Sequence, residues 1–134
     1  MGLVLDTSAI VHLERQPTAP EKLPFAAEPV VLPIIVWAEA LIGVRLADTP
    51  ERAARRRGLL ERIRLMAGLE PVTAEAAEIY ADLYTHLRAS GQTIPQNDLQ
   101  VAATALALGF GVLVGSRDER HFRQIPNLRV EVLP

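Results

Sequence analysis

Four carboxylates from distant parts of the chain could do chemistry together. They are Asp6, Glu39, Asp98 and Asp118. Each lies at or near the start of an expected helix, and two of them, Asp6 and Asp118, also follow short apolar runs that are typical of buried strands. In open α/β sheets, ligands bind beyond the carboxyl ends of the strands. The sequence therefore predicts that the four acids can meet at one edge of a sheet.

Gathering four carboxylates creates a charge problem that points to a metal ion. Two ionised carboxylates about 4 Å apart repel each other by roughly 4 kcal/mol at an effective dielectric of about 20. Lysine cannot neutralise them, because Lys22 in a proline-rich segment is the single lysine of the sequence. Oxygen ligands select hard cations, so we expect Mg²⁺, with Mn²⁺ as a substitute, rather than zinc. Such a centre suits the hydrolysis of a phosphodiester.

Each acid also has a simpler structural interpretation. Asp6 could cap the helix that follows it, and Asp98 and Asp118 could be first-turn acids favoured by the helix dipole. Glu39 is harder to explain in this way, because no other charged residue lies between positions 28 and 45. A carboxylate in such an apolar helix needs a hydrogen-bond partner, a proton or a metal. Both interpretations stay open at this point.

The apolar pattern predicts the elements that must position these acids. Buried strands are expected at residues 2–5, 30–32 and 112–114, and an edge strand at 129–132. Helices are expected to begin near Asp6, Ile34, Thr49, Thr73, Asn97 and Asp118, with the third ending near Gly68, the fourth at Gly91 and the fifth at Gly109. Prolines 17, 20 and 24 mark a loop, and Pro71-Val72 a short extended piece. Short strands separated by helices predict a parallel sheet with helices on both faces.

Length and composition limit the class of protein. With 134 residues, 49% of them hydrophobic and 22% charged, the chain predicts one domain, 1–134, with a well-buried core. The sequence has no cysteine, which excludes disulfides, thiolate zinc sites and cysteine nucleophiles and fits a reducing compartment. We recognise no targeting signal and no membrane span, and therefore expect a cytoplasmic protein. The net charge of −2 does not by its total predict a strongly basic nucleic-acid binder.

Several short segments share their order and spacing with a known family. They are Leu5-Asp6-Thr7-Ser8, Glu39 in its apolar helix, Ile94-Pro95-Gln96-Asn97-Asp98 followed by Val101-Ala102-Ala103-Thr104-Ala105, Ser116-Arg117-Asp118 with His121-Phe122, and Ile125-Pro126-Asn127-Leu128. Together they resemble a PIN-domain ribonuclease of the VapC type, the toxin of a prokaryotic toxin–antitoxin pair. The resemblance implies a three-layer α/β/α sandwich with a short, mainly parallel central sheet. It also implies a homodimer that cuts single-stranded or structured RNA with magnesium.

The resemblance assigns roles to individual residues. The metal-binding and catalytic carboxylates would be Asp6, Glu39, Asp98 and Asp118, with Asp6 and Asp98 the most direct ligands and Asp118 the least uniform in the family. Ser8, Asn97 and Ser116 would not bind the metal themselves but would orient the carboxylates that do. Gly115 departs from the family pattern without an assignable consequence. The family also implies a cognate antitoxin that occupies hydrophobic and acidic grooves and inserts an arginine among the carboxylates.

Arginines near the acids could contact RNA phosphates. Arg117, Arg120 and Arg123 bracket Asp118, and we expect at least one of them, with Arg117 and Arg120 as the candidates, to approach substrate. His121 could also contact substrate, although packing of the His-Phe pair is favoured. Aromatic residues make up 4% of the chain, so a base-stacking platform is not predicted.

The helix that follows Thr49 carries a second group of arginines. Between 51 and 64 the chain has six arginines and two acids. A solvated face with pairs such as Arg57–Glu61 is favoured over a phosphate-binding surface. Trp37 and Phe25 are expected to be core or partner-contact residues.

Two alternative functions fit the same acids. A non-catalytic module of this fold would use them structurally and would gain no thermal stability from Mg²⁺ or Mn²⁺. A nuclease of this fold could also act on DNA. Other phosphate chemistries fit worse, because the sequence has no G-x-G-x-x-G or Walker loop. An aspartyl-phosphate phosphatase would need a second acid where Ser8 stands, and a phospho-receiver would need a late-strand lysine.

Overall fold

Strands and helices alternate along the chain. The computed structural model describes residues 1–18, 22–23 and 26–134, and within them it has five strands and six helices. The strands are β1 (Leu3–Leu5), β2 (Val30–Pro33), β3 (Ala67–Glu70), β4 (Gly111–Val114) and β5 (Val130–Val132). The helices are α1 (Thr7–Arg15), α2 (Ile34–Arg45), α3 (Pro50–Met66), α4 (Ala74–Ala89), α5 (Gln96–Leu108) and α6 (Glu119–Arg123).

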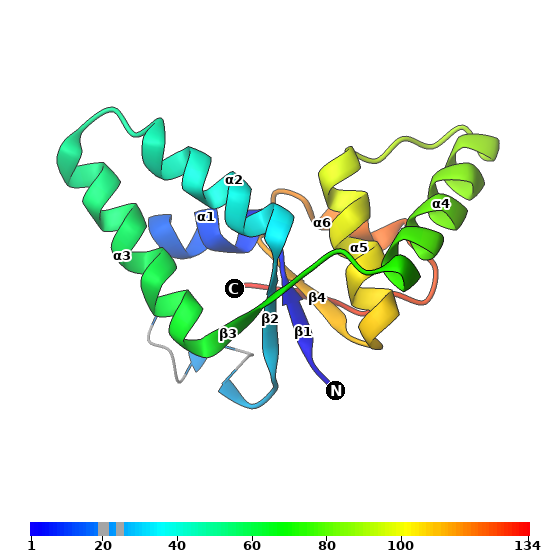
Figure 1. The fold of residues 1–134 in the computed structure, drawn as a ribbon, viewed down its shortest axis with the longest axis horizontal. Coiled ribbons are helices and arrows are strands. Elements are labelled where there is room, and N and C mark those ends of the chain that lie inside the picture. Colours follow the sequence, from blue (N-terminus) through cyan, green and yellow to red (C-terminus); the bar gives the residue numbers. More distant parts are fainter. Residues whose placement is uncertain (19–21, 24–25) are drawn as a thin grey trace.

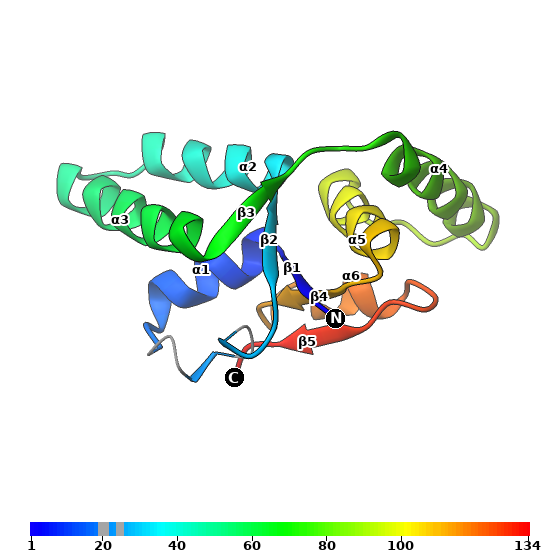
Figure 2. The same ribbon diagram turned by 60° about the horizontal axis from the view of Figure 1, so that its bottom comes forward.

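All five strands form one parallel sheet in the order β3-β2-β1-β4-β5. In its register, Leu3 of β1 pairs with Val30 of β2 on one side and with Gly111 of β4 on the other. Helices α1, α2 and α3 lie on one side of the sheet and α4, α5 and α6 on the other (Figures 1 and 2). The expected three-layer α/β/α sandwich is therefore confirmed, with a sheet that is entirely parallel.

The topology creates a ligand-binding position between β1 and β4. After β1 the chain moves toward β2, whereas after β4 it moves the opposite way toward β5. The two connections therefore diverge at the carboxyl ends of neighbouring strands, which is the topological switch point where open α/β sheets bind ligands. Asp6 directly follows β1 and Asp118 lies in the turn after β4, so both are brought to this point.

The core explains why the strands are short apolar runs. Every residue of β1 and β4 is buried, because helices cover both faces of the sheet. Phe122 of α6 is fully buried in the same core. Packing on both faces thus fixes β1 and β4, and it thereby positions the residues that directly follow these strands.

Local signals set several helix ends as the sequence predicts. The Thr49 side chain accepts a hydrogen bond from the Arg52 amide at 3.1 Å, and Thr73 caps α4 in the same way. Gly91, just beyond α4, has φ of +71°, the left-handed conformation for which glycine carries no Cβ penalty. Capping chemistry is local, so it can be recognised from sequence.

One strand was not predicted. The helix over the arginines was expected to end near Gly68, but Ala67–Glu70 is β3, and Pro71-Val72 lies beyond it. The segment Ala-Gly-Leu-Glu lacks β-branched residues and has no apolar alternation. Its strand conformation comes from pairing along its whole length with β2, which is a tertiary contact.

Helix α2 is more exposed than its sequence suggests. Its apolar composition predicts burial on nearly all sides, yet Val36 is its one fully buried residue and Ile42 is 55% exposed. The helix extends beyond the sheet beside α3 rather than through the core (Figure 1). A surface of this kind is typical of a partner contact.

The predicted proline loop falls partly outside the described residues, since Pro20, Pro24 and Phe25 are not among them. Among the residues that are described, no helix combines the length and apolar character needed to cross a membrane.

Candidate active site

Asp6 is both a helix cap and a member of the acidic site. Its Oδ2 accepts hydrogen bonds from the Ser8 amide at 3.0 Å and from Ser8 Oγ at 2.5 Å, which begins α1. The residue is only 2% exposed. Burial raises the pKa of Asp6 to about 6 against the opposing effect of the two Ser8 hydrogen bonds, and the charges of Asp98 and Asp118 raise it further. Capping therefore does not remove Asp6 from the cluster.

Ser8 links α1 to the end of β4. Its hydroxyl donates to Asp6 and accepts a hydrogen bond from the Gly115 amide at 3.1 Å. A Cβ at position 115 would lie 2.6 Å from the Ser8 carbonyl oxygen, closer than real Cβ contacts come. The structure thus explains Gly115, because no side chain fits where β4 meets the first turn of α1.

Asp98 is held by a histidine. His121 Nδ1 lies 2.6 Å from Asp98 Oδ2, and both side chains are largely buried. Burial raises the pKa of Asp98, the His121 hydrogen bond lowers it, and the nearby charges of Asp118 and Glu39 raise it. One ligand atom from each of Asp98, Asp118 and His121 lies within 4.8 Å of the others.

The sequence predicted the environment of Phe122 correctly but not that of His121. Its neighbour Phe122 does pack in the core, as expected of the His-Phe pair, but His121 faces the acids instead of packing with it. The spacing of three residues between Asp118 and His121 in a helical turn was the available signal, because it places both side chains on one side of the turn.

Glu39 approaches the cluster from α2. Its Oε1 accepts a hydrogen bond from Thr7 Oγ1 at 2.8 Å, and its charge contributes to the raised pKa of Asp98. Glu39 therefore has the partner that a carboxylate in an apolar helix requires. Thr7 is a second residue that sequence reasoning missed, and its position directly after Asp6 was the only hint.

The site carries an excess of negative charge. Over the described ranges, none of the four acids forms an ion pair with arginine or lysine, and the one basic side chain in contact with them is His121 on Asp98. The raised pKa values of Asp6 and Asp98 reflect burial first and then the charges of the neighbouring carboxylates. The clustered carboxylate oxygens form a donor set that suits a hard divalent cation.

The residues expected to support the ligands differ in their contacts. Asn97 is half-buried in the first turn of α5, and Ser116 is exposed in the turn after β4. Among the residues described, neither side chain makes a hydrogen bond, whereas Ser8 makes two. Arg117 lines a hollow of about 270 Å³ with Thr7 and Glu39.

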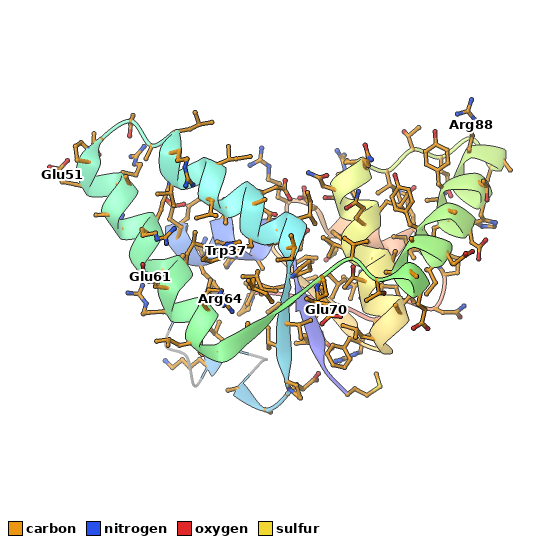
Figure 3. All side chains as sticks on the ribbon, in the orientation of Figure 1. Trp37, Glu51, Glu61, Arg64, Glu70 and Arg88 are labelled. Carbon is orange, nitrogen blue, oxygen red and sulfur yellow. The ribbon has the colours of Figure 1, made fainter. Side chains whose placement is uncertain are left out.

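Several arginines of α3 make ion-pair or ring contacts within the protein. Arg57 pairs with Glu61 at 3.1 Å, which confirms the expected surface pair. Arg57 and Arg64 also lie over the ring of Trp37, at 5.8 and 5.6 Å from its centroid. Figure 3 shows Trp37 and Arg64 between α2 and α3. The Trp37 contacts join α3 to α2, which the solvated-face interpretation did not predict.

Comparison with known proteins agrees with the fold and the site. The family profile described as PIN domain matches residues 3–128. The chain belongs to the PIN-domain family.

Its curated relatives place it more narrowly. The chain is 29% identical over 134 residues to Ribonuclease VapC of Rickettsia bellii (strain RML369-C), covering 100% of this chain and 98% of the relative. It is 32% identical over 127 residues to Ribonuclease VapC4 of Mycobacterium tuberculosis (strain ATCC 25618 / H37Rv), covering 93% and 92%. Within the PIN-domain family, the chain is thus a VapC-type ribonuclease.

Solved structures share the fold over nearly the whole chain. VapBC2 from Rickettsia felis, bound to a DNA fragment from its promoter, has a TM-score of 0.85 at 22% identity and covers 100% of both chains. VapBC-5 from Mycobacterium tuberculosis, a member of the VapBC family of toxin-antitoxin systems, has a TM-score of 0.74 at 31% identity, covering 98% of this chain and 97% of that one.

Proposed function

We propose that this single-domain chain hydrolyses phosphodiester bonds in RNA with Mg²⁺ and acts as the toxin of a toxin–antitoxin pair. The observation that carries the proposal is the convergence of Asp98, Asp118 and His121 on one point, with Asp6 and Glu39 close by and no arginine or lysine pairing with the acids in the described chain. Such a cluster at the switch point of a parallel sheet is suited to a cation and a phosphate ester.

Four carboxylates would hold the cation in this proposal: Asp6, Glu39, Asp98 and Asp118. When bound, the cation supplies positive charge that stabilises the phosphoryl group and makes water a better nucleophile. The protein's own contribution is preorganisation. Ser8 fixes the Asp6 carboxylate, and His121 fixes that of Asp98. Mn²⁺ would substitute for Mg²⁺, since both accept oxygen ligands.

Glu39 has a further role through water. Its Oε1 is occupied by Thr7, which leaves Oε2 free to accept a hydrogen bond from the attacking water. Arg117 lines the same hollow as Glu39 and would contact a substrate phosphate from the other side. The two side chains would thereby orient the nucleophile and the phosphodiester relative to each other.

Cleavage assays with Asp6→Asn and Asp98→Asn test the assignment. Both variants keep a side chain of the same shape, and each should lower the rate of RNA cleavage with Mg²⁺ by more than about 100-fold, because even indirect partners of a metal cost about 10–100-fold when removed. Asp48→Asn, an exposed acid paired with Arg52, is the matched control and should cleave at the parental rate. Parental rates in both site variants would remove these acids from the mechanism.

Two measurements separate the alternatives. Addition of Mg²⁺ or Mn²⁺ should raise the melting temperature of the parent and not of Asp6→Asn, whereas a non-catalytic module would show no such gain. Competing RNA and DNA oligonucleotides of one sequence should show preferential cleavage of the RNA. A preference for DNA would instead support the nuclease alternative.

An antitoxin partner is supported by the solved relatives, since VapBC-5 is a member of a toxin-antitoxin family. The antitoxin would seat on an apolar groove of about 480 Å³ between α1 and α3, lined by Leu13, Leu59, Ile63 and Leu65 among others. Glu14 and Leu59 also line the hollow that contains Glu39 and Arg117, so the groove continues toward the acids. The chain would also form a homodimer, as the resemblance implies.

A further inference from the structure

A second groove leads away from the acids on the opposite side of the sheet. It begins at a shallow hollow of about 590 Å³ lined by Pro95, Arg120, His121 and Gln124, together with Thr93 and Ile94. His121 belongs both to this hollow and to the acidic cluster, so the groove starts at the candidate active site.

The groove continues along the loop between α4 and α5. A second hollow, of about 280 Å³, is lined by Tyr84, Arg88 and Gln92, and again by Thr93 and Ile94. Because Thr93 and Ile94 line both hollows, the two are neighbours on either side of these residues. Figure 3 shows Arg88 at the far end of α4 with its side chain projecting outward. We call this surface the α4–α6 groove.

The charge of the α4–α6 groove is opposite to that of the acidic cluster. Arg120 and Arg88 line it, and no carboxylate does. In the part of the chain that is described, neither arginine forms an ion pair, whereas Arg123 on the same helix as Arg120 pairs with Glu119. Arg120 lies next to the acidic cluster and Arg88 farther along the groove, so the two exposed guanidinium groups form a suitable path for a polyanion whose cleaved bond lies at the cluster.

Tyr84 adds an aromatic surface to the α4–α6 groove. It is 46% exposed, and its ring is stacked on Tyr80 with 6.3 Å between centroids. Arg88 Nη1 donates a hydrogen bond to the Tyr84 hydroxyl at 3.2 Å, which further fixes the ring. A held, exposed aromatic ring can stack on an unpaired base of any identity.

We propose that the α4–α6 groove binds a single-stranded segment of the RNA substrate next to the cleaved bond. Arg120 contacts a phosphate near the cleaved bond, Arg88 contacts another farther along the strand, and Tyr84 stacks on one base. The proposal rests on the proposed ribonuclease function. RNA fits this surface better than a protein partner, because both hollows combine an exposed arginine with the absence of any carboxylate among their described lining residues, and one adds an exposed aromatic ring. The groove between α1 and α3 is lined by Glu14 and more extensively by apolar side chains, which suits a protein segment.

The experiment measures binding of the full chain to a labelled, unstructured RNA of about 12 nucleotides by fluorescence anisotropy with divalent cations chelated, so that cleavage does not occur. Arg88→Gln and Arg120→Gln should each weaken binding several-fold. Each should also lower the slope of log K against log salt by about 0.7, the value for one phosphate contact on a single strand. Arg123→Gln and Arg52→Gln are the controls, since both arginines are exposed, paired and outside the groove.

Stacking is tested separately at Tyr84. Tyr84→Ala should weaken binding about tenfold, and Tyr84→Phe should bind like the parent, because a phenyl ring stacks as a phenol ring does. In cleavage assays with Mg²⁺, Arg88→Gln should raise KM and leave kcat unchanged, as expected of a contact made equally in ground and transition states. The arginine side chains are exposed, so the unfolding curves of the Gln variants should match that of the parent. Tyr84→Ala also loses the stacking on Tyr80, so its RNA affinity is compared at a temperature well below the start of its own unfolding curve.

The outcomes distinguish this inference from the proposed function. If Arg88→Gln and Arg120→Gln match Arg123→Gln in affinity and in salt slope while the parent still cleaves RNA, the α4–α6 groove is not an RNA path but the function stands. Loss of inhibition by the antitoxin with unchanged RNA affinity would assign the groove to the protein partner and overturn the inference. A parent that neither binds nor cleaves RNA would overturn both.

Discussion

At the scale of single residues, the site combines side chains with structural and chemical roles. Asp6 begins α1 through the Ser8 amide and also lies within range of the charges of Asp98 and Asp118. The structural interpretation of this acid and the functional one are therefore compatible. A buried carboxylate without a positive partner reduces stability, and sites that bind cations commonly accept this cost for function.

The raised pKa of Asp6 predicts an unusual pH dependence. In the metal-free protein its pKa is about 6, above the ordinary value of 3.8, so the folded state binds a proton more tightly than the unfolded state. The free energy of unfolding contributed by this group is therefore highest below pH 3.8 and falls as pH rises from there through about 6, by up to about 3 kcal/mol. Asp6→Asn, which stays neutral, should melt at a higher temperature than the parent at pH 7.5.

Thermal unfolding of the two proteins in a chelator, followed by circular dichroism across this pH range, checks the prediction. The difference in melting temperature should shrink as pH falls below 3.8, where Asp6 becomes protonated in both the folded and the unfolded states of the parent. A difference that is equally large at both pH values would instead point to a change in capping.

His121 is expected to act on the metal through Asp98. Replacing it with Gln removes the 2.6 Å contact to Asp98 Oδ2, so the concentration of Mg²⁺ that half-saturates cleavage should rise about 10–100-fold. The rate at saturating Mg²⁺ should change much less. His86→Gln, on the exposed face of α4, serves as the control. An unchanged Mg²⁺ requirement in His121→Gln would show that Asp98 does not depend on this contact.

At the scale of elements, the junction between β4 and α1 positions the site. The Gly115 amide donates to Ser8 Oγ, and Ser8 in turn donates to Asp6, so the ends of two neighbouring strands are tied together through one serine. Parallel strands place their carboxyl ends at one edge, which brings together residues more than 100 positions apart.

Gly115→Ala should disturb this junction. The added Cβ would meet the Ser8 carbonyl oxygen at 2.6 Å, so the backbone must shift, at a cost of about 1–3 kcal/mol in unfolding free energy. The rate of RNA cleavage should fall as well, because Ser8 holds the Asp6 carboxylate in place by hydrogen bonds. Gly43→Ala is a matched control: nothing lies within 4 Å of its added Cβ, and in helix α2 it should stabilise by up to about 1 kcal/mol. Chemical denaturation of both variants gives the comparison.

At the scale of the whole molecule, two grooves leave the acids in different directions. The apolar groove lies between α1 and α3, and the α4–α6 groove lies across the sheet. A protein segment and an RNA strand could thus approach the same acids from different sides. Inhibition would then require only that the antitoxin reach the acids, not that it cover the RNA path.

Leu65→Glu should separate inhibition from activity. Leu65 lines the apolar groove and is 88% exposed, so the substitution should leave folding and RNA cleavage unchanged. A charge on this surface should weaken antitoxin binding by more than about tenfold, since a desolvated, unpaired carboxylate costs several kcal/mol. Co-expression with the antitoxin should then fail to restore growth. Leu46→Glu, 76% exposed and outside the groove, should remain inhibited.

Many of the helix ends and buried strands of this protein could be predicted from short stretches of its sequence. Capping at Thr49 and Thr73, the glycine after α4 and the buried strands β1, β2 and β4 all follow from short-range patterns. The four acids could also be selected in advance, because strand ends and helix starts in an α/β pattern converge. What short-range patterns could not supply was β3, since its four residues become a strand only by pairing with β2.

The chemical surroundings of the acids came from folding itself. Three contacts of the site join residues 23, 32 and 107 positions apart: His121 with Asp98, Thr7 with Glu39, and the Gly115 amide with Ser8 Oγ. The shift of the Asp6 pKa likewise requires burial that no sequence pattern measures. Residue types state which chemistry is available, whereas desolvation and distance, which arise only when the layers close over the sheet, decide which of those groups act together.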